Sequence, residues 1–229
     1  MTHLLRRPLP AITVVVALLV APACAAADDG SDATAPPAEV SPTTSTPATP
    51  TAVSTTVAPS TTTGAAARTL IDFADPASAT GWSTVDDRVM GGVSRSTVDW
   101  QDGRLRFRGT VSLENNGGFS SVRGPAGEFG GTAAGATTFV VGAEGDGTTY
   151  LLQVVDRDGG RWVQRFRTTA GVDTDHDLPV TGFEPVTSRL NPRIADAPLD
   201  PARVVQFTIY VVDDQTGPFE VRISRFAAR

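Results

Sequence analysis

Apolar side chains in the C-terminal part of the chain recur at every second position. The pattern is clear in residues 104–108 (RLRFR) and again in residues 219–223 (FEVRI). A period of two places alternate side chains on opposite faces of a strand, so both segments are predicted to be half-buried strands. Six further apolar segments, each bounded by Gly, Asp, Asn or Pro, are also predicted to be strands: residues 69–74, 118–123, 137–143, 149–156, 161–168 and 204–212.

These elements indicate an all-β domain. Helical periodicity is not sustained anywhere, and a parallel sheet would need crossover helices between its strands. Short strands without helices are typical of an antiparallel β-sandwich or jelly roll. Residues 68–229 are therefore predicted to be a single jelly-roll β-sandwich of about eight strands or slightly more. The almost continuously apolar residues 204–212 are predicted to be a central strand.

A leader is predicted before this domain. Two arginines precede the apolar residues 11–21, and small residues follow, which is the pattern of a secretory signal peptide over residues 1–23. The apolar run is too short to cross a bilayer as a helix. Cys24 comes next, in a stretch that resembles a bacterial lipobox, so we predict that Cys24 is lipidated. Ordinary cleavage that leaves Cys24 as a free thiol is the alternative.

Residues 24–67 are predicted to be a disordered tether. Thr, Ser and Pro make up 22 of the 34 residues from 31 to 64, and this stretch contains no aromatic residue, Leu or Ile. Such a composition cannot bury enough apolar surface to fold. The leader, the lipid and the tether together predict an exported protein that is anchored to the cell membrane through lipid, with its domain on the extracytoplasmic side.

Charge and composition exclude several functions. All 19 basic residues are Arg and the formal net charge is −6, which argues against a nucleic-acid partner because binding a polyanion depends on excess positive charge. A single Cys excludes a disulfide framework and a cysteine-ligated zinc site. His176 is the only His outside the leader and has no nucleophile motif nearby. We therefore expect a protein without catalysis and without a cofactor.

Three segments carry a more specific signal: residues 82–94 (WSTVDDRVMGGVS), 111–123 (VSLENNGGFSSVR) and 213–219 (DDQTGPF). Their content and order resemble the complex I intermediate-associated protein 30 family, over about residues 70–226. The resemblance implies a galactose-binding-like jelly roll, in agreement with the strand pattern. It also implies a chaperone-like role, because the named members of the family help to assemble mitochondrial respiratory complex I.

Two kinds of partner fit these observations. The predicted leader places the domain outside the cytoplasm, whereas the redox arm of bacterial complex I faces the cytoplasm, so the expected client is another protein of the cell envelope. The alternative is a carbohydrate-binding module for cell-wall or extracellular polysaccharide, a function that occurs among relatives of the fold. An exposed apolar patch would favour the protein client, and a polar groove floored by aromatic residues would favour the glycan.

Five polar residues lie in two motifs that are otherwise devoted to packing: Asp87, Glu114, Asn115, Asn116 and Arg123. Polar groups among packed residues need hydrogen-bond partners. One interpretation is that they satisfy one another, through an Asp87–Arg123 pair and through asparagine side chains that cap turns. The other is that they line a polar face for the hydroxyl groups of a saccharide or for the backbone of a partner.

The aromatic residues and paired glycines of the motifs are predicted to be structural. Trp82, Phe119 and Phe219 are expected to anchor the core rather than to stack on sugar rings. The paired glycines are expected to permit positive φ angles or close backbone approach. Trp100, at a predicted hairpin tip, is a further candidate for the ligand or partner face, although it could instead fold back over the edge of the sheet.

An acidic segment has the spacing of a calcium loop. Asp173, Asp175, Asp177 and Glu184 occupy positions 1, 3, 5 and 12 of an EF-hand-like sequence. Leu178 stands where such a loop needs Gly, and no helical pattern flanks the segment. A solvated hairpin tip is therefore favoured over a metal site, and no metal is predicted.

Overall fold

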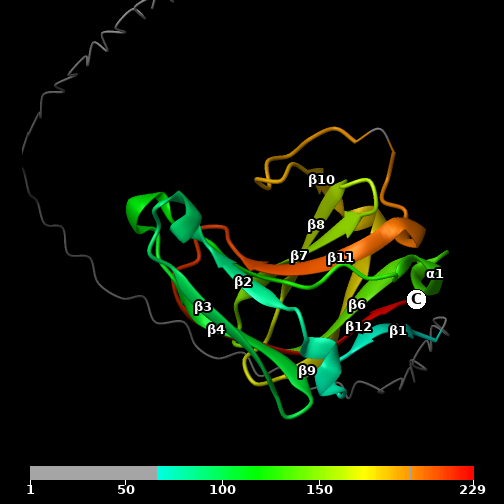
Figure 1. The fold of residues 1–229 in the computed structure, drawn as a ribbon, viewed down its shortest axis with the longest axis horizontal. Coiled ribbons are helices and arrows are strands. Elements are labelled where there is room, and N and C mark those ends of the chain that lie inside the picture. The colour runs from blue at the N-terminus through cyan, green and yellow to red at the C-terminus, as the bar shows by residue number, and fades with distance from the viewer. Residues whose placement is uncertain (1–65, 196) are drawn as a thin grey trace, which may run out of the picture. The chain divides into compact units, whose positions relative to one another are not determined.

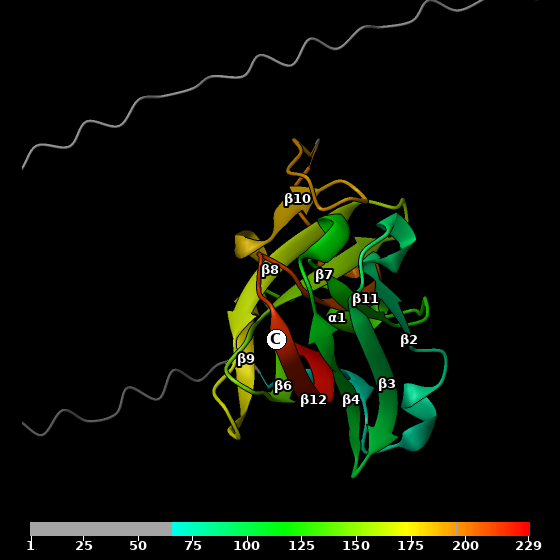
Figure 2. The same ribbon diagram turned by 90° about the vertical axis from the view of Figure 1, so that its left-hand side faces the viewer.

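The computed structural model describes residues 66–195 and 197–229, whose strands form a two-layer sandwich (Figure 1). Sheet A joins, in spatial order, β3 (Arg95–Gln101), β4 (Arg104–Val111), β12 (Gly217–Ala228), β6 (Thr138–Glu144) and β9 (Asp173–Pro179), and β1 (Arg68–Asp72) also pairs with β12. Sheet B joins β10 (Glu184–Val186), β8 (Arg161–Arg167), β7 (Thr149–Asp156), β11 (Val204–Val211), β5 (Ser120–Arg123) and β2 (Ser83–Asp86). The strand pairs within both sheets are antiparallel, as Figure 2 shows for β12 between β6 and β4.

The helices of the described residues are single turns: η1 (Pro76–Ala79), η2 (Asp87–Met90), η3 (Glu114–Asn116), α1 (Gly130–Ala133), η4 (Val180–Gly182) and η5 (Pro201–Arg203). None of the helices in this part of the chain is long and apolar enough to cross a membrane. The predicted signal peptide, Cys24 and nearly all of the predicted tether lie outside the described residues.

The predicted jelly-roll sandwich is confirmed, and each of the eight predicted strands is present. Residues 204–211 form β11, which pairs with β7 and β5 and is therefore a central strand, as expected. Four strands were not predicted, namely β2, β3, β9 and β10. They lie at the edges of the two sheets, where one side of the strand has no neighbour and fewer apolar side chains are needed.

Aromatic rings fill the space between the sheets. Trp82 stacks on Phe226 with ring centroids 5.8 Å apart, and Phe226 stacks in turn on Phe207 at 5.0 Å. Phe219 is also buried and meets Phe107 edge to face at 4.8 Å. Trp82 and Phe219 are thus core anchors, as predicted, and the stacked rings tie β11 of sheet B to β12 of sheet A.

The expected hairpin tip in the acidic segment is wrong, because residues 173–179 form strand β9 at the edge of sheet A. The three aspartates of β9 alternate along its outer face, and each pairs with a different arginine: Arg104–Asp173, Arg225–Asp175 and Arg229–Asp177. Glu184 begins β10 in the other sheet. The four acids therefore do not form one cluster, and the described residues contain no group of three or more ligands that could hold a metal.

The stacked rings predict where the sandwich is most sensitive to mutation. Phe226→Ala should lower the free energy of unfolding by about 3–5 kcal/mol, because the cavity would separate Trp82 from Phe207. Val172→Ala, at a half-exposed side chain, should change it by less than about 0.5 kcal/mol. Urea unfolding of the full chain, followed by circular dichroism, measures both values. Equal losses for the two variants would contradict this account of the core.

Candidate functional site

The carboxylate of Asp87 joins two loops that are distant in the sequence. Asp87 begins η2 and its side chain is fully buried. Its Oδ1 accepts a hydrogen bond from the backbone N–H of Ser94 at 3.0 Å. Its Oδ2 accepts hydrogen bonds from the hydroxyl of Ser94 and from the backbone N–H groups of Gly118, at 2.7 Å, and Phe119, at 3.3 Å. The loop that follows β2 is thereby fixed to the loop that precedes β5.

The paired glycines let the backbone close around this carboxylate. A Cβ atom on Gly92 would lie 2.3 Å from Asp87 Oδ1, and one on Gly117 would lie 2.7 Å from Oδ2. Gly91 and Gly118 have φ angles of 96° and 131°, which L side chains rarely adopt. The expectation of positive φ and close backbone approach is therefore confirmed, and the carboxylate is the group that the backbone approaches.

The pKa of Asp87 reflects two opposing effects. Burial favours the protonated form and raises the pKa, but the hydrogen bonds from Ser94, Gly118 and Phe119 together outweigh burial and hold the pKa below its usual value. The carboxylate is therefore ionised at neutral pH, and no cationic side chain among the described residues pairs with it. The hypothetical Asp87–Arg123 pair is not formed, because the exposed side chain of Arg123 makes no ion pair within residues 66–195 and 197–229.

Two other aspartates tie strands together in a similar way. Asp86, next to Asp87, accepts hydrogen bonds from the backbone and the hydroxyl of Ser96, which links β2 of sheet B to β3 of sheet A. The carboxylate of Asp146 accepts hydrogen bonds from the hydroxyl of Tyr150 at 3.1 Å and from the backbone N–H of Glu220 at 2.8 Å. The turn before β7 is thus bound to β12. Asp86, Asp87 and Asp146 thus tie distant segments of the sandwich together.

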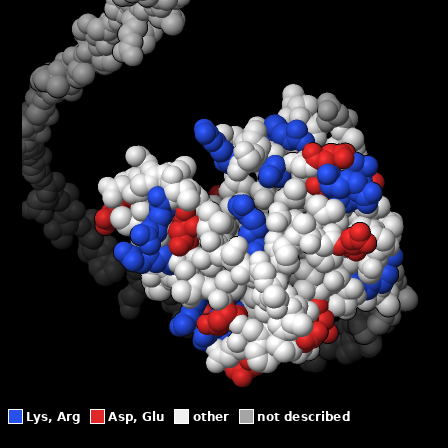
Figure 3. Space-filling view, viewed as in Figure 1, with Lys and Arg blue, Asp and Glu red and all other residues white. Residues whose placement is uncertain are grey.

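A cleft of about 700 Å³ opens on the outer face of sheet B, beside these loops. Figure 3 shows the molecule hollowed here, with basic side chains beside the hollow. The cleft has an apolar floor with polar groups around it. It is lined by Val85, Val89, Met90, Gly117, Gly118, Phe119, Arg123, Ser188, Arg189, Leu190, Tyr210, Val212, Asp213 and Asp214.

The floor of the cleft is apolar because sheet B buries a second hydrophobic cluster on its outer face. Leu151, Val163, Val186 and Tyr210 form this cluster, and the partly buried Phe119, Leu190 and Val212 pack against it. The outer face of an antiparallel sheet in a sandwich is ordinarily polar, so an apolar cluster there needs cover. The segment after β10, which carries Leu190, supplies part of that cover and forms one wall of the cleft.

Some of the charged side chains around the cleft form ion pairs and others do not. Arg165 donates two hydrogen bonds of 2.7 Å to the carboxylate of Asp213. These bonds lower the pKa of Asp213, and the guanidinium balances its negative charge at the edge of the cleft. Arg123 and Arg189 line the cleft, and neither forms an ion pair in the part of the chain that the structure describes. Asp214 is the remaining acidic side chain that lines the cleft.

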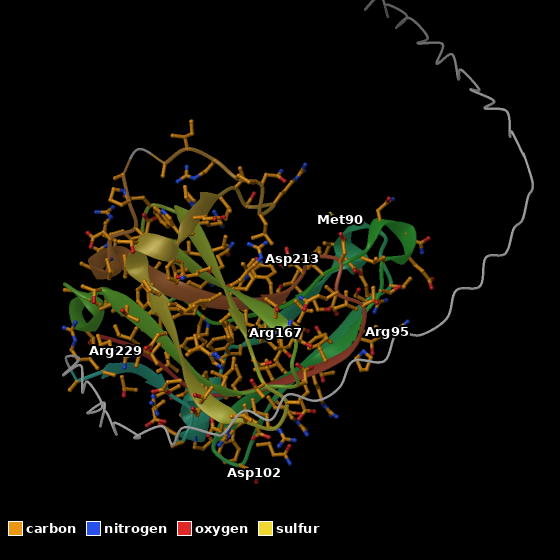
Figure 4. The ribbon with its side chains drawn as sticks, turned by 180° about the vertical axis from the view of Figure 1, so that it is seen from behind. Met90, Arg95, Asp102, Arg167, Asp213 and Arg229 are labelled. Atoms are coloured by element: carbon orange, nitrogen blue, oxygen red, sulfur yellow. The ribbon has the colours of Figure 1, made fainter. Side chains whose placement is uncertain are left out.

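The two loops held by Asp87 expose aliphatic side chains next to the cleft. Val89 and Met90 on η2 are 74% and 60% exposed, and Val93 and Leu113 follow with 39% and 44%. The loops are in contact here, because the hydroxyl of Ser94 accepts a hydrogen bond from Ser112 N–H. We call Val89, Met90, Val93 and Leu113 the apolar rim. Figure 4 shows Met90 at the same end of the sandwich as Asp213, and far from Asp102 and Arg229.

The structure separates the polar residues that the sequence singled out. Arg123 lines the cleft, and Asp87 lies buried behind Gly118 and Phe119. Glu114, Asn115 and Asn116 are exposed on η3. The two asparagines have φ angles of 56° and 60°, a conformation that Asn tolerates better than most residues, so their type is explained by the turn.

Trp100 lies on β3 of sheet A, away from the residues that line the cleft. It is 41% exposed, and its Nε1–H donates to the carbonyl of Phe73 at 2.7 Å. The turn of this hairpin is Asp102-Gly103, so Trp100 precedes the tip by two residues and folds back onto the chain at the end of β1.

Sequence reasoning missed most of the cleft. Phe119 was expected in the core, whereas it is partly buried and lines the cleft. Tyr210, Leu190 and Arg189 had no motif to mark them. Met90 did carry a signal, because it is a large apolar residue within a turn-forming motif, and such a residue must either pack inward or remain exposed.

A family model decides the relationship of this chain to known proteins. The model of Complex I intermediate-associated protein 30 (CIA30) matches residues 71–223. The chain belongs to the CIA30 family. The match covers the Asp87 loops, the cleft and the apolar rim, which are therefore parts of a CIA30 domain. No curated protein matches this chain significantly.

A solved structure shares the fold of this CIA30 domain. A family 11 carbohydrate-binding module of the cellulosomal cellulase Lic26A-Cel5E of Clostridium thermocellum aligns with a TM-score of 0.50 and 12% identity, over 72% of this chain and 95% of the module. An agarase aligns with a TM-score of 0.48 and 13% identity, over 71% of this chain and 24% of the agarase. At such low identity the likeness to the module shows the fold alone.

The buried carboxylate predicts a pH-dependent effect of its removal. Asp87→Asn should lower the free energy of unfolding by about 2–4 kcal/mol at neutral pH, because the amide would place N–H groups against backbone donors. The pKa of Asp87 is lower in the folded chain than in the unfolded chain, so its contribution is complete above about pH 4 and is lost as the pH falls through the folded pKa. The difference between wild type and variant should therefore narrow below about pH 4 in urea unfolding. A pH-independent difference would contradict this origin of the stability.

The close approach of the backbone to Asp87 gives a second prediction. Gly92→Ala should destabilise the fold by about 1–3 kcal/mol, since its Cβ cannot be placed without displacing the Asp87 carboxylate. Gly131→Ala is the matched control, because its Cβ would meet no atom within 4 Å and its backbone is helical. This control should gain about 0.4–1 kcal/mol. Thermal unfolding compares the two, and a stable Gly92→Ala variant would refute the role of the glycine.

Proposed function

We propose that this CIA30 domain is a non-catalytic binding module that holds a protein partner at the cleft and the apolar rim. The observation that carries the proposal is the composition of the rim. Four of the seven large apolar side chains that the described residues expose belong to the two loops joined by Asp87. Aliphatic side chains gathered in this way next to a cleft are typical of a protein contact surface.

The location of the partner follows from the N-terminal sequence. The apolar leader and Cys24 support an exported protein that lipid anchors to the extracytoplasmic side of the membrane. Its client is then a protein of the cell envelope. Assistance to that client as an assembly or chaperone-like factor agrees with the name of the family, whose model is that of a complex I intermediate-associated protein.

The proposal does not include catalysis. His176 lies on β9 of sheet A, whereas the cleft lies on sheet B. Its ring packs 4.9 Å from that of Phe166, and burial lowers the pKa of the imidazole despite the nearby Asp175 and Asp177. His176 thus packs between β9 of sheet A and β8 of sheet B.

Polysaccharide binding is the second candidate. The observation in its favour is the aromatic part of the cleft floor, Phe119 and Tyr210, next to Arg123. Aromatic faces and a planar donor are groups that a sugar ring contacts. The fold is shared with a carbohydrate-binding module, which is compatible with this candidate.

The first candidate is tested by crosslinking the full chain in its own cells, followed by purification and mass spectrometry. Met90→Asp should reduce recovery of the crosslinked protein at least tenfold, because a carboxylate in the rim cannot be desolvated without cost. Val172→Asp, at another exposed apolar side chain outside the rim, should leave recovery unchanged. Both variants should keep the wild-type melting temperature.

Two outcomes would reject a protein partner at the rim. Recovery of the same proteins with Met90→Asp as with wild type would place the partner elsewhere. Recovery of polysaccharide fragments alone, lost in Tyr210→Ala, would establish the second candidate in its place.

A further inference from the structure

We infer that the part of the partner that enters the cleft is an extended peptide segment in which a bulky apolar side chain lies beside one or more carboxylates. This inference rests on the proposed function, because it assigns the chemistry of the segment that the cleft and the rim would hold. Three features of the cleft carry it: two arginines without an ion pair among the described residues, an apolar floor, and its size.

The arginines select for negative charge. Arg123 projects from the end of β5 and Arg189 from the segment after β10, so two guanidinium groups come from two different elements of the cleft. The nearby Asp213 does not neutralise them, because both of its oxygens already accept hydrogen bonds from Arg165. A chain with a net charge of −6 thus gathers in one cleft two arginines that form no ion pair among the described residues, against a single remaining lining acid, Asp214. Carboxylates on the partner would supply the missing counter-charges.

The floor selects for an apolar side chain. Val85, Leu190 and Val212 line it together with Phe119 and Tyr210. An apolar side chain placed there removes apolar surface from water on both molecules. A sugar ring would instead lose water from hydroxyl groups that the aliphatic part of the floor, Val85, Leu190 and Val212, cannot hydrogen-bond. The floor therefore favours a peptide over a glycan.

The size selects for a short segment. A volume of about 700 Å³ lies within the range of roughly 300–1,000 Å³ that encloses one small ligand, so the cleft takes a few residues rather than a folded surface. The apolar rim extends the contact beyond the cleft. An anchored segment in the cleft with additional contacts on the rim is an arrangement that suits a client whose chain is not yet folded or assembled.

The test uses a library of random twelve-residue peptides displayed on phage, selected against the immobilised full chain. Peptides that bind the cleft are those lost when selection is repeated against the Arg123→Gln/Arg189→Gln variant. Arg108→Gln is the matched control, since Arg108 is a half-exposed arginine on sheet A that lies 4.0 Å from Asp99. The cleft-dependent peptides should be enriched in Asp and Glu next to Leu, Ile, Phe or Met.

Synthetic copies of the enriched peptides give the affinities. Each should bind the double variant at least tenfold more weakly than wild type, and the control variant equally well. Replacing the peptide's acids by Gln should weaken binding to wild type by a similar factor, and raising the salt concentration should do the same. Tyr210→Ala should weaken binding even for the Gln peptides, because it removes the floor rather than the charge.

Several results would overturn the inference. Cleft-dependent peptides without an excess of acidic residues would refute the role of the arginines, and a selection that yields no cleft-dependent peptide would refute peptide binding in the cleft. Binding of polygalacturonate that is lost in the double variant would assign the cleft to acidic polysaccharide. The proposed function is judged separately: a crosslink that is lost in Met90→Asp but kept in the Arg123→Gln/Arg189→Gln variant would leave the proposed function standing and refute this inference.

Discussion

The buried carboxylate of Asp87 is the constraint on which this end of the sandwich depends. A buried charge without partners costs several kcal/mol, so the backbone must deliver donors to it. Ser94, Gly118 and Phe119 supply these donors from two loops that are distant in the sequence. Neither loop can satisfy the carboxylate alone, and the glycines are required because the backbone must pass so close to it. Two separate motifs thus become one structural unit.

This unit links stability to the proposed binding surface. Gly118 and Phe119 donate to Asp87 and also line the cleft, so the carboxylate fixes the position of one wall. Because hydrogen bonds to Asp87 hold the two loops, not every apolar side chain on them is needed for packing. Val89 and Met90 can therefore stay exposed on loops that hydrogen bonds already hold in place, and such preorganisation limits the conformational entropy that is lost when a partner binds.

The two sheets present different outer faces. Sheet A carries alternating arginines and aspartates, such as Arg106 with Asp99 and Arg225 with Asp175. Exposed pairs of this kind contribute little stability, about 0–1 kcal/mol each, but they keep an open sheet edge charged and soluble. The outer face of sheet B is apolar around Tyr210 and is only partly covered. The outer face of sheet B is therefore the one that still has apolar surface for a partner to cover.

The sequence by itself determined what depends on local pattern. Alternation gave strands such as 104–108, the apolar residues 204–212 became a central strand, and the ordered motifs indicated the family. The edge strand β9 escaped detection because the arginines that pair with its aspartates come from other strands. The Asp87–Arg123 pair failed because Arg123 follows the inward-facing Val122 and so points outward, whereas Asp87 points inward.

Only the tertiary structure decided where the candidate site lies. Phe119, Leu190 and Tyr210 are far apart in the sequence, and they meet because β5 pairs with β11 while the segment after β10 folds over the same face. Strand order and the choice of which apolar residues remain uncovered depend on contacts between distant segments. A local pattern of apolar and polar residues carries no record of those contacts.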